Sequence, residues 1–132
     1  MLRGQVAVEF LVLFTIGLFI FILAATFFPA QLREAADAES QADQLLEQIK
    51  VRAIVASTSR TDFNTSLFVP PVINGLPIVL SVSSGSDSVA RVFQNGRLLA
   101  SAQLPLIEDV FEENLINQIR IHKNASGVFV TI

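Results

Sequence analysis

Glu9 is the side chain whose surroundings in the sequence are chemically most unusual. It directly precedes an apolar run over residues 10–28, FLVLFTIGLFIFILAATFF, which only Thr15, Gly17 and Thr26 interrupt. A carboxylate beside a lipid-facing run is costly, so such residues commonly mark a functional site or a specific partner. The alternative interpretation is that Glu9 lies in the headgroup layer of a membrane and has no specific role.

The apolar run is long enough to cross a membrane as a helix. Counted from Val6 it has about 23 residues, or about 35 Å as an α-helix, against about 30 Å of hydrocarbon in a bilayer. Arg3 precedes the run. Because basic residues stay preferentially in the cytoplasm, we expect the remainder of the chain to lie outside the cell.

A secretory signal that is removed after the apolar run is the first competing interpretation. The small residues Ala24, Ala25 and Ala30 lie near the end of the run. The run is longer than an ordinary signal core of about 7–15 residues, and no A-x-A-like site closes it. We therefore expect the apolar helix to be retained.

Residues 3–11, RGQVAVEFL, form a compact motif that ends in Glu9 and the start of the apolar run. The motif closely resembles the class III signal peptide of archaeal type IV pilin precursors whose mature chains begin with Gln. The resemblance implies that a membrane-embedded aspartic prepilin peptidase cuts between Gly4 and Gln5, with Arg3 in the basic leader. Glu9 then becomes the fifth residue of the mature chain. Ala7 departs from the family pattern, which commonly has Ser there.

The resemblance also implies a function, a localisation and partners. It covers residues 1–30 closely and the helix-then-β layout of the remaining chain loosely. A chain of this family is a precursor in the cytoplasmic membrane. After cleavage, the pilus assembly machinery polymerises it through its N-terminal helix into an extracellular adhesive filament.

Glu9 has a physical role in such a filament. Cleavage releases an α-amino group at Gln5, and an amine or a carboxylate buried without a partner costs several kcal/mol. Glu9 can neutralise the amine of its own chain or that of a neighbouring subunit. We assign Glu9, together with Arg3, to maturation or assembly without choosing between the two.

Apolar side chains along the run are expected to pack in the filament core. A single Phe side chain buries about 150–250 Å². Gly17 allows close approach of a neighbouring helix, but Leu13 and Phe21, four residues away on either side, are large, so no dimer motif is assigned. The predicted core residues are Phe10, Leu11, Phe14, Leu18, Phe19, Phe21, Ile22 and Phe27.

After Pro29 the chain is rich in Ala, Glu, Gln and Leu, which favour helix. The apolar residues in this stretch recur at steps of three and four, which is typical of an amphipathic helix. They are Leu32, Ala35, Ala38, Ala42, Leu45, Ile49, Ala53 and Ala56. We predict one helix over about residues 5–57, kinked or loosened at Pro29.

Residues 59–132 alternate short apolar runs with Ser, Thr, Asn, Gly and Pro, which predicts strands and turns. The predicted strands are 66–72, 77–83, 89–93, 97–102, 116–122 and 128–132. Asn95-Gly96 is a strong hairpin signal, residues 123–127 form a longer hairpin loop, and 108–117 form a short helical turn or an exposed connection.

The predicted fold class is therefore α+β, a long hydrophobic helix followed by a small antiparallel β-sheet or sandwich domain of the type IV pilin kind. The expected organisation is a leader at 1–4, a membrane and filament-core helix at 5–28, an amphipathic continuation at 29–58 and an outer β domain at 59–132.

Composition argues against several functional classes. Net charge is -3, no basic cluster occurs and cysteine is absent, so nucleic-acid partners and thiol chemistry are not expected. We find no catalytic motif and expect neither an enzyme nor a cofactor. His122 is interpreted as a strand-surface residue. The acidic cluster of Glu108, Asp109, Glu112 and Glu113 is interpreted as a solvated face rather than a metal site.

Two N-x-[ST] patterns lie outside the membrane, at Asn64 and at Asn124. They are candidate N-glycosylation sites, and the loop position favours Asn124. Two other functions stay open, namely a membrane-anchored surface adhesin or minor pilin, and an archaeal flagellin-like motility filament subunit. Because Trp and Tyr are absent, we expect no exposed aromatic cluster, which argues against a dedicated adhesin.

Overall fold

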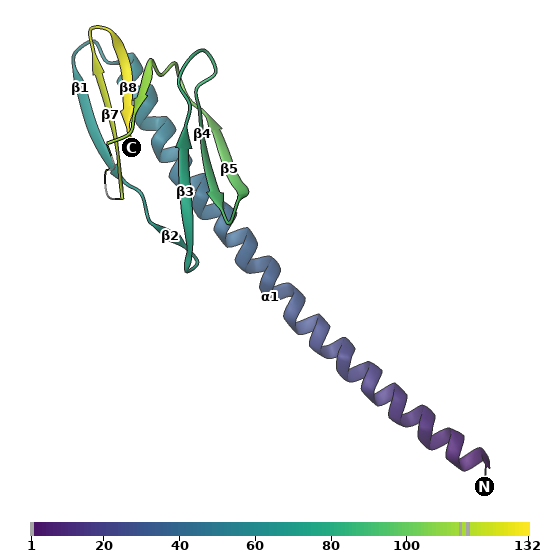
Figure 1. Cartoon of the computed structure of the whole chain (residues 1–132). Helices are drawn as coiled ribbons and strands as arrows, with labels where there is room; N and C mark the ends of the chain where they lie inside the picture. The colour runs from purple at the N-terminus through teal and green to yellow at the C-terminus, as the bar shows by residue number, and fades with distance from the viewer. Residues whose placement is uncertain (1, 114, 116) are drawn as a thin grey trace. The chain divides into compact units, whose positions relative to one another are not determined.

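The computed structural model describes residues 2–113, 115 and 117–132. The chain divides into two compact units, Met1–Ala36 and Asp37–Ile132. One helix, α1 (Leu2–Thr58), makes up the described part of the first unit and begins the second, and every strand follows it in sequence (Figure 1). A long apolar helix followed by an antiparallel-rich β region is the α+β class that the sequence predicts.

α1 continues through Pro29 without a break in its secondary structure. A proline inside a helix removes one N–H and crowds the preceding turn, which is why the sequence predicts a kink or a loosened turn there. The helix nevertheless runs from Leu2 to Thr58, so Pro29 does not divide α1 in two.

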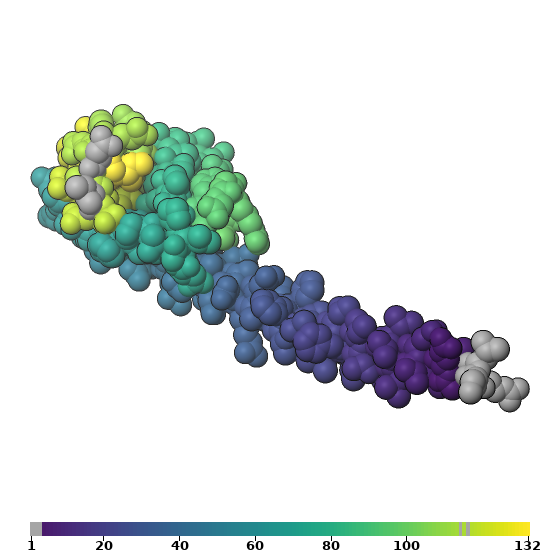
Figure 2. Space-filling view, turned by 60° about the horizontal axis from the view of Figure 1, so that its bottom comes forward, coloured from purple at the N-terminus to yellow at the C-terminus, as the bar shows by residue number. Residues whose placement is uncertain are grey.

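The second unit contains two four-stranded sheets, with strand orders β1-β7-β8-β6 and β2-β3-β4-β5. Their strands are β1 (Phe63–Phe68), β2 (Val72–Ile73), β3 (Leu76–Val82), β4 (Val89–Gln94), β5 (Arg97–Gln103), β6 (Asp109–Phe111), β7 (Gln118–Asn124) and β8 (Gly127–Thr131). Neighbouring strands are antiparallel, except that β6 runs parallel to β8. β8 lies inside its sheet, and Figure 2 shows its yellow atoms among those of neighbouring strands.

The core of the second unit is formed by one face of α1 and the inward side chains of the strands. The buried helix residues are Ala38, Ala42, Leu45, Leu46, Ile49, Ala53 and Ala56. Four of them are alanines, so much of this buried face is made of small side chains. The strands contribute alternate residues, such as Ile119 and Ile121 of β7. The predicted amphipathic face is confirmed from Ala38 onward, whereas Leu32 belongs to the first unit and is 68% exposed.

The last turn of α1 is held by polar groups of the second unit. Ser59 N donates to Val55 O at 3.0 Å, and Lys123 Nζ of β7 donates to Ser57 O at 3.0 Å and to Ser59 O. A cation is favourable beside the negative end of a helix dipole. Lys123 therefore links the end of the helix to β7.

Four predicted strands agree with β3, β4, β5 and β8 to within one residue at each end. The prediction 66–72 is wrong at both ends, because the strand there, β1, covers Phe63–Phe68 and the chain then passes through Pro70 and Pro71, which have no N–H to donate. β7 begins at Gln118, and Ile116, the predicted first residue, lies outside the described residues.

The prediction of a helical turn within 108–117 is wrong for Asp109–Phe111, which forms β6. Val110 is half-buried against the core, and the flanking Asp109 and Phe111 face outward. The alternation of outward and inward residues is difficult to recognise in the sequence, because it lies within the acidic cluster. Asn114 and Ile116, also within the predicted segment, lie outside the described residues.

Two Asn-Gly pairs make tight turns. Asn95 and Gly96 have φ of 51° and 75° and connect β4 to β5, as predicted. Asn74 and Gly75 have φ of 50° and 76° and connect β2 to β3, a hairpin that the sequence analysis did not identify. Positive φ at both central residues is the conformation that favours Asn-Gly.

Candidate processing and assembly segment

The apolar segment of the first unit is exposed. It is long and apolar enough to span a membrane, and none of its most apolar window is buried. Phe10 is 69% exposed, Phe14 62% and Phe21 70%. A helix that is apolar all round belongs in lipid or in the interior of an assembly.

The polar groups within this segment are satisfied by the helix itself. Thr15 Oγ1 donates to Leu11 O at 2.7 Å, and Thr26 Oγ1 lies 3.0 Å from Ile22 O and 2.9 Å from Leu23 O. Such bonds to the preceding turn remove the need for water. The segment can therefore enter a water-free environment at little cost from these hydroxyls.

Glu9 is the exception. Its residue is exposed, and its carboxylate makes no hydrogen bond or ion pair with any other residue that the structure describes. No other charged residue follows it in the chain before Arg33. A carboxylate at this border requires water, headgroups or a cation from another group to compensate its charge.

Gly4 and Gln5, the predicted cleavage residues, lie in α1, as does Arg3. A Cβ added to Gly4 would meet nothing within 4 Å, so packing inside the chain does not require glycine there. A glycine also weakens a helix by about 1 kcal/mol relative to alanine.

The predicted filament-core residues do not form a single stripe. At about 100° per residue, Phe10, Phe14 and Phe21 share one side of the helix. The rings of Phe10 and Phe14 stack with centroids 6.3 Å apart. Gly17 lies on the same side, and a Cβ there would meet nothing within 4 Å.

The other five predicted core residues lie elsewhere around the helix. Leu11, Leu18 and Ile22 are about a quarter turn from the phenylalanine side, and Phe19 and Phe27 lie on the far side. Each is about half exposed or more. The predicted set is thus distributed around the helix.

The two candidate glycosylation residues differ in their surroundings. Asn124, at the end of β7, accepts a hydrogen bond at its Oδ1 from Ser126 N at 2.8 Å and so helps to form the β7–β8 turn. Asn64, in β1, is exposed and opposite His122. Its side chain makes no hydrogen bond to any other residue in the described part of the chain.

The expectation that no aromatic cluster is exposed is wrong. His122 and Phe129 stack with centroids 5.4 Å apart, and Phe129 and Phe111 stack at 5.9 Å. The three residues come from β7, β8 and β6, on outward positions, with Phe111 42% exposed. Because the cluster depends on the register of three strands, one of which the sequence did not reveal, local patterns could not identify it.

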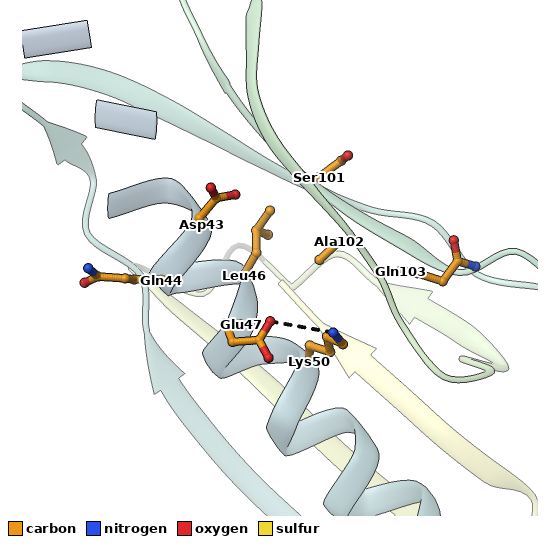
Figure 3. Close-up of a pocket in the computed structure, with 8 residues that line it drawn as sticks. All are labelled: Asp43, Gln44, Leu46, Glu47, Lys50, Ser101, Ala102 and Gln103. Carbon is orange, nitrogen blue, oxygen red and sulfur yellow. Dashed lines mark ion pairs between the residues drawn. The ribbon is translucent and has the colours of Figure 1, made fainter. Parts of the chain in front are cut away.

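An open groove of about 490 Å³ lies between α1 and β5 in the second unit (Figure 3). Asp43, Glu47 and Lys50 border it from the helix, and Ser101 and Gln103 from the strand. Glu47 Oε2 lies 3.7 Å from Lys50 Nζ. The Glu47 carboxylate thus has a partner on its own helix, and the groove is an open surface hollow.

Within residues 2–113, 115 and 117–132, the structure holds no group of three or more His, Cys, Asp or Glu side chains that could bind a metal ion. Comparisons of the chain with protein-family models, with curated proteins and with solved structures find no match.

Proposed function

We propose that this chain is the precursor of a structural subunit of an archaeal type IV pilus. A prepilin peptidase cleaves it between Gly4 and Gln5, and its N-terminal helix then assembles with copies of itself into the core of an extracellular adhesive filament. The observation that carries the proposal is an exposed apolar segment of α1 that directly follows Glu9, whose carboxylate makes no ion pair with any residue that the structure describes.

The apolar surface of the first unit requires an apolar environment. Burying one Phe or Leu side chain is worth about 1.5–3 kcal/mol, and the segment exposes many of them. Lipid meets this need in the precursor, and neighbouring helices meet it in the filament. The spread of large side chains around the whole helix supports an arrangement in which each helix has several neighbours.

The carboxylate supports a processed N-terminus. Hydrolysis of the bond between Gly4 and Gln5 creates a cationic amine four residues before Glu9, a distance of about 6 Å along the helix. An amine and a carboxylate that enter an apolar bundle together compensate one another, whereas either alone costs several kcal/mol. The amine can belong to the same chain or to a neighbouring subunit.

The second unit is suited to remain in water. Many of its apolar residues form one core, and its charged residues lie outside that core. Other apolar side chains, such as Phe68, Val79 and Leu106, remain exposed. In the proposed filament this unit coats the helical core and meets other surfaces.

A membrane-anchored surface protein is the alternative that the apolar helix alone would also support. The two functions differ in the fate of the residues before Gln5. The experiment is to shear filaments from cells that make the protein, and then to determine the intact mass and N-terminal sequence of the recovered chain. Recovery of a chain that starts at Gln5 supports the pilin, whereas a chain that starts at Met1 and occurs only in the membrane overturns it.

A further inference from the structure

A row of three stacked rings crosses the outer face of the sheet β1-β7-β8-β6. His122 and Phe129 are nearly parallel, with an interplanar angle of 17°, and Phe129 and Phe111 meet at 27°. Cross-strand aromatic pairs stabilise a sheet. A row that stays partly exposed on the outer face is also a surface on which a ligand can lie.

A hollow of about 400 Å³ adjoins this row. Phe111 and His122 supply ring surface, and Asn64, Glu113, Arg120 and Thr131 supply polar groups. The Asn, Glu and Arg side chains are planar and together provide several donors and acceptors. Because a sugar ring has apolar C–H groups and several hydroxyls, this combination of rings and planar polar groups suits a saccharide.

Asn64 connects the hollow to the sequence pattern for N-glycosylation. It lines the hollow, it is the first residue of Asn64-Thr65-Ser66, and it lies on β1 at the edge of the sheet. The Asn64 amide is uncommitted to any other described residue. Asn124 accepts a bond from Ser126 N at its Oδ1, which leaves its Nδ2 equally available. Asn64 lines the hollow and Asn124 does not, and this difference favours Asn64 over the Asn124 that the loop position suggested.

We propose that Asn64 is the glycosylated residue of this chain and that the first sugars of its glycan occupy the hollow beside Phe111 and His122. Attachment forms a bond between Asn64 Nδ2 and the anomeric carbon of the first sugar. The bond from that carbon to the phosphate of a lipid-phosphate-linked oligosaccharide breaks. The lipid phosphate leaves with the electron pair, and the amide releases one proton. The proposal rests on the export of the second unit that the proposed function includes.

The site of attachment is tested on the full chain recovered from the cells that make it. Trypsin places the two patterns in separate peptides, residues 61–91 and 124–132, because cleavage follows Arg60, Arg91 and Lys123. We expect a saccharide mass on peptide 61–91 that is lost in Asn64→Gln and kept in Asn124→Gln. An unmodified peptide 61–91, or a saccharide only on peptide 124–132, overturns the proposal.

The same sample separates this proposal from the proposed function. A chain that starts at Gln5 and carries no saccharide on peptide 61–91 overturns the glycan alone. A chain that starts at Met1 and carries the saccharide at Asn64 keeps the glycan and overturns the pilin.

The position of the glycan is tested by its effect on thermal unfolding. Asn64→Gln is compared with the glycosylated chain in three backgrounds: unchanged, Phe111→Ala and Phe68→Ala. Phe68 is the matched control because it is 63% exposed on β1 and does not line the hollow. We expect Asn64→Gln to lower the unfolding midpoint by a few degrees in the unchanged and Phe68→Ala chains, and not in Phe111→Ala. An equal loss in all three backgrounds overturns the packing of the glycan against the ring.

Discussion

The two units of this chain differ in how far their apolar residues are buried, although one helix contributes to both. In the first unit, large apolar side chains surround α1 and remain exposed. In the second, one apolar face of α1 is buried in a core with the strands, whereas Val51, Ile54 and Val55 of the same helix remain exposed. The second unit therefore has a core of its own, whereas the large apolar side chains of the first unit are exposed.

Because of this difference in burial, substitutions in the two units are expected to affect different properties of the protein. A substitution in the core of the second unit is expected to change the free energy of unfolding. A substitution at the start of the first unit is expected to leave folding unchanged and to alter processing or assembly. Matched pairs of variants on the same helix can test this separation directly.

The largest effect is expected for Gly4→Leu, which should nearly abolish cleavage. A misfit of about 1.4 kcal/mol in the transition state lowers a rate about tenfold, and a leucine next to the cut replaces a hydrogen atom by four carbons. Leu also favours helix over Gly, so a loss of helix cannot explain the result. The measurement is the fraction of chains that start at Gln5.

Gly17→Leu is the matched control for this variant. It makes the same change on the same helix, and the space around both glycines is open within the chain. Cleavage at the normal level in Gly4→Leu would contradict the assignment of the cleavage site.

Glu9→Gln is expected to reduce filament yield by about tenfold or more, because the new amine would lose its partner in an apolar core at a cost of several kcal/mol. Glu47→Gln is the control, since Glu47 is exposed and forms only a surface pair with Lys50. Quantified filaments per cell give the yield, and N-terminal sequencing shows whether maturation or assembly fails. Normal yield and normal cleavage in Glu9→Gln would remove Glu9 from both roles.

How far the sequence predicts the candidate site depends on how far apart in the sequence the interacting residues lie. Glu9 and the apolar run are neighbours in sequence, so local reading places them together, and the structure confirms one long helix there. The row of Phe111, His122 and Phe129 depends on the pairing of three strands. No local pattern specifies that pairing, and the absence of Trp and Tyr was a misleading indication.

Ile49→Ala is expected to destabilise the second unit by about 2–5 kcal/mol, because it leaves a cavity in a packed core. Ile49 is fully buried, whereas Ile54, one and a half turns later, is 42% exposed. Ile54→Ala should therefore change stability by no more than about 0.5 kcal/mol. Hydrogen exchange of the β4 and β7 amides in the full chain in detergent measures both. Equal effects of the two variants would contradict the assignment of the helix face.

The fold was predictable where one residue type dictates local geometry. Asn95-Gly96 specified a hairpin because both residues adopt positive φ, and the buried face of α1 followed from its three- and four-residue spacing. β2 and β6 have only two and three residues. Strands that short exist because neighbours hold them, as β8 holds β6, and their own sequences carry too little periodicity to reveal them.

Ser88→Ala is expected to destabilise the second unit by about 1–3 kcal/mol, the cost of leaving a buried donor unsatisfied. Ser88 is fully buried, donates to Gly85 O at 2.8 Å and accepts from Ile107 N at 3.0 Å. Ser81→Ala, on the exposed side of β3, is the control and should stay within about 0.5 kcal/mol. The same hydrogen-exchange measurement applies. No difference between the two serines would mean that water replaces Ser88 as the partner of Ile107 N.

The smallest effect is expected for Arg97→Gln, which removes the pair between Arg97 Nη2 and Glu39 Oε1 at 2.8 Å. The two side chains are 66% and 45% exposed, and solvent screening limits such surface pairs to about 0–1 kcal/mol. The effect should shrink further as salt is raised, because the Debye length falls from about 10 Å at 0.1 M to about 3 Å at 1 M. Urea unfolding of the full chain in detergent at both salt concentrations measures it. A loss as large as that of Ile49→Ala would mean that this charged contact, and not the apolar face of α1, holds the helix to the strands of the second unit.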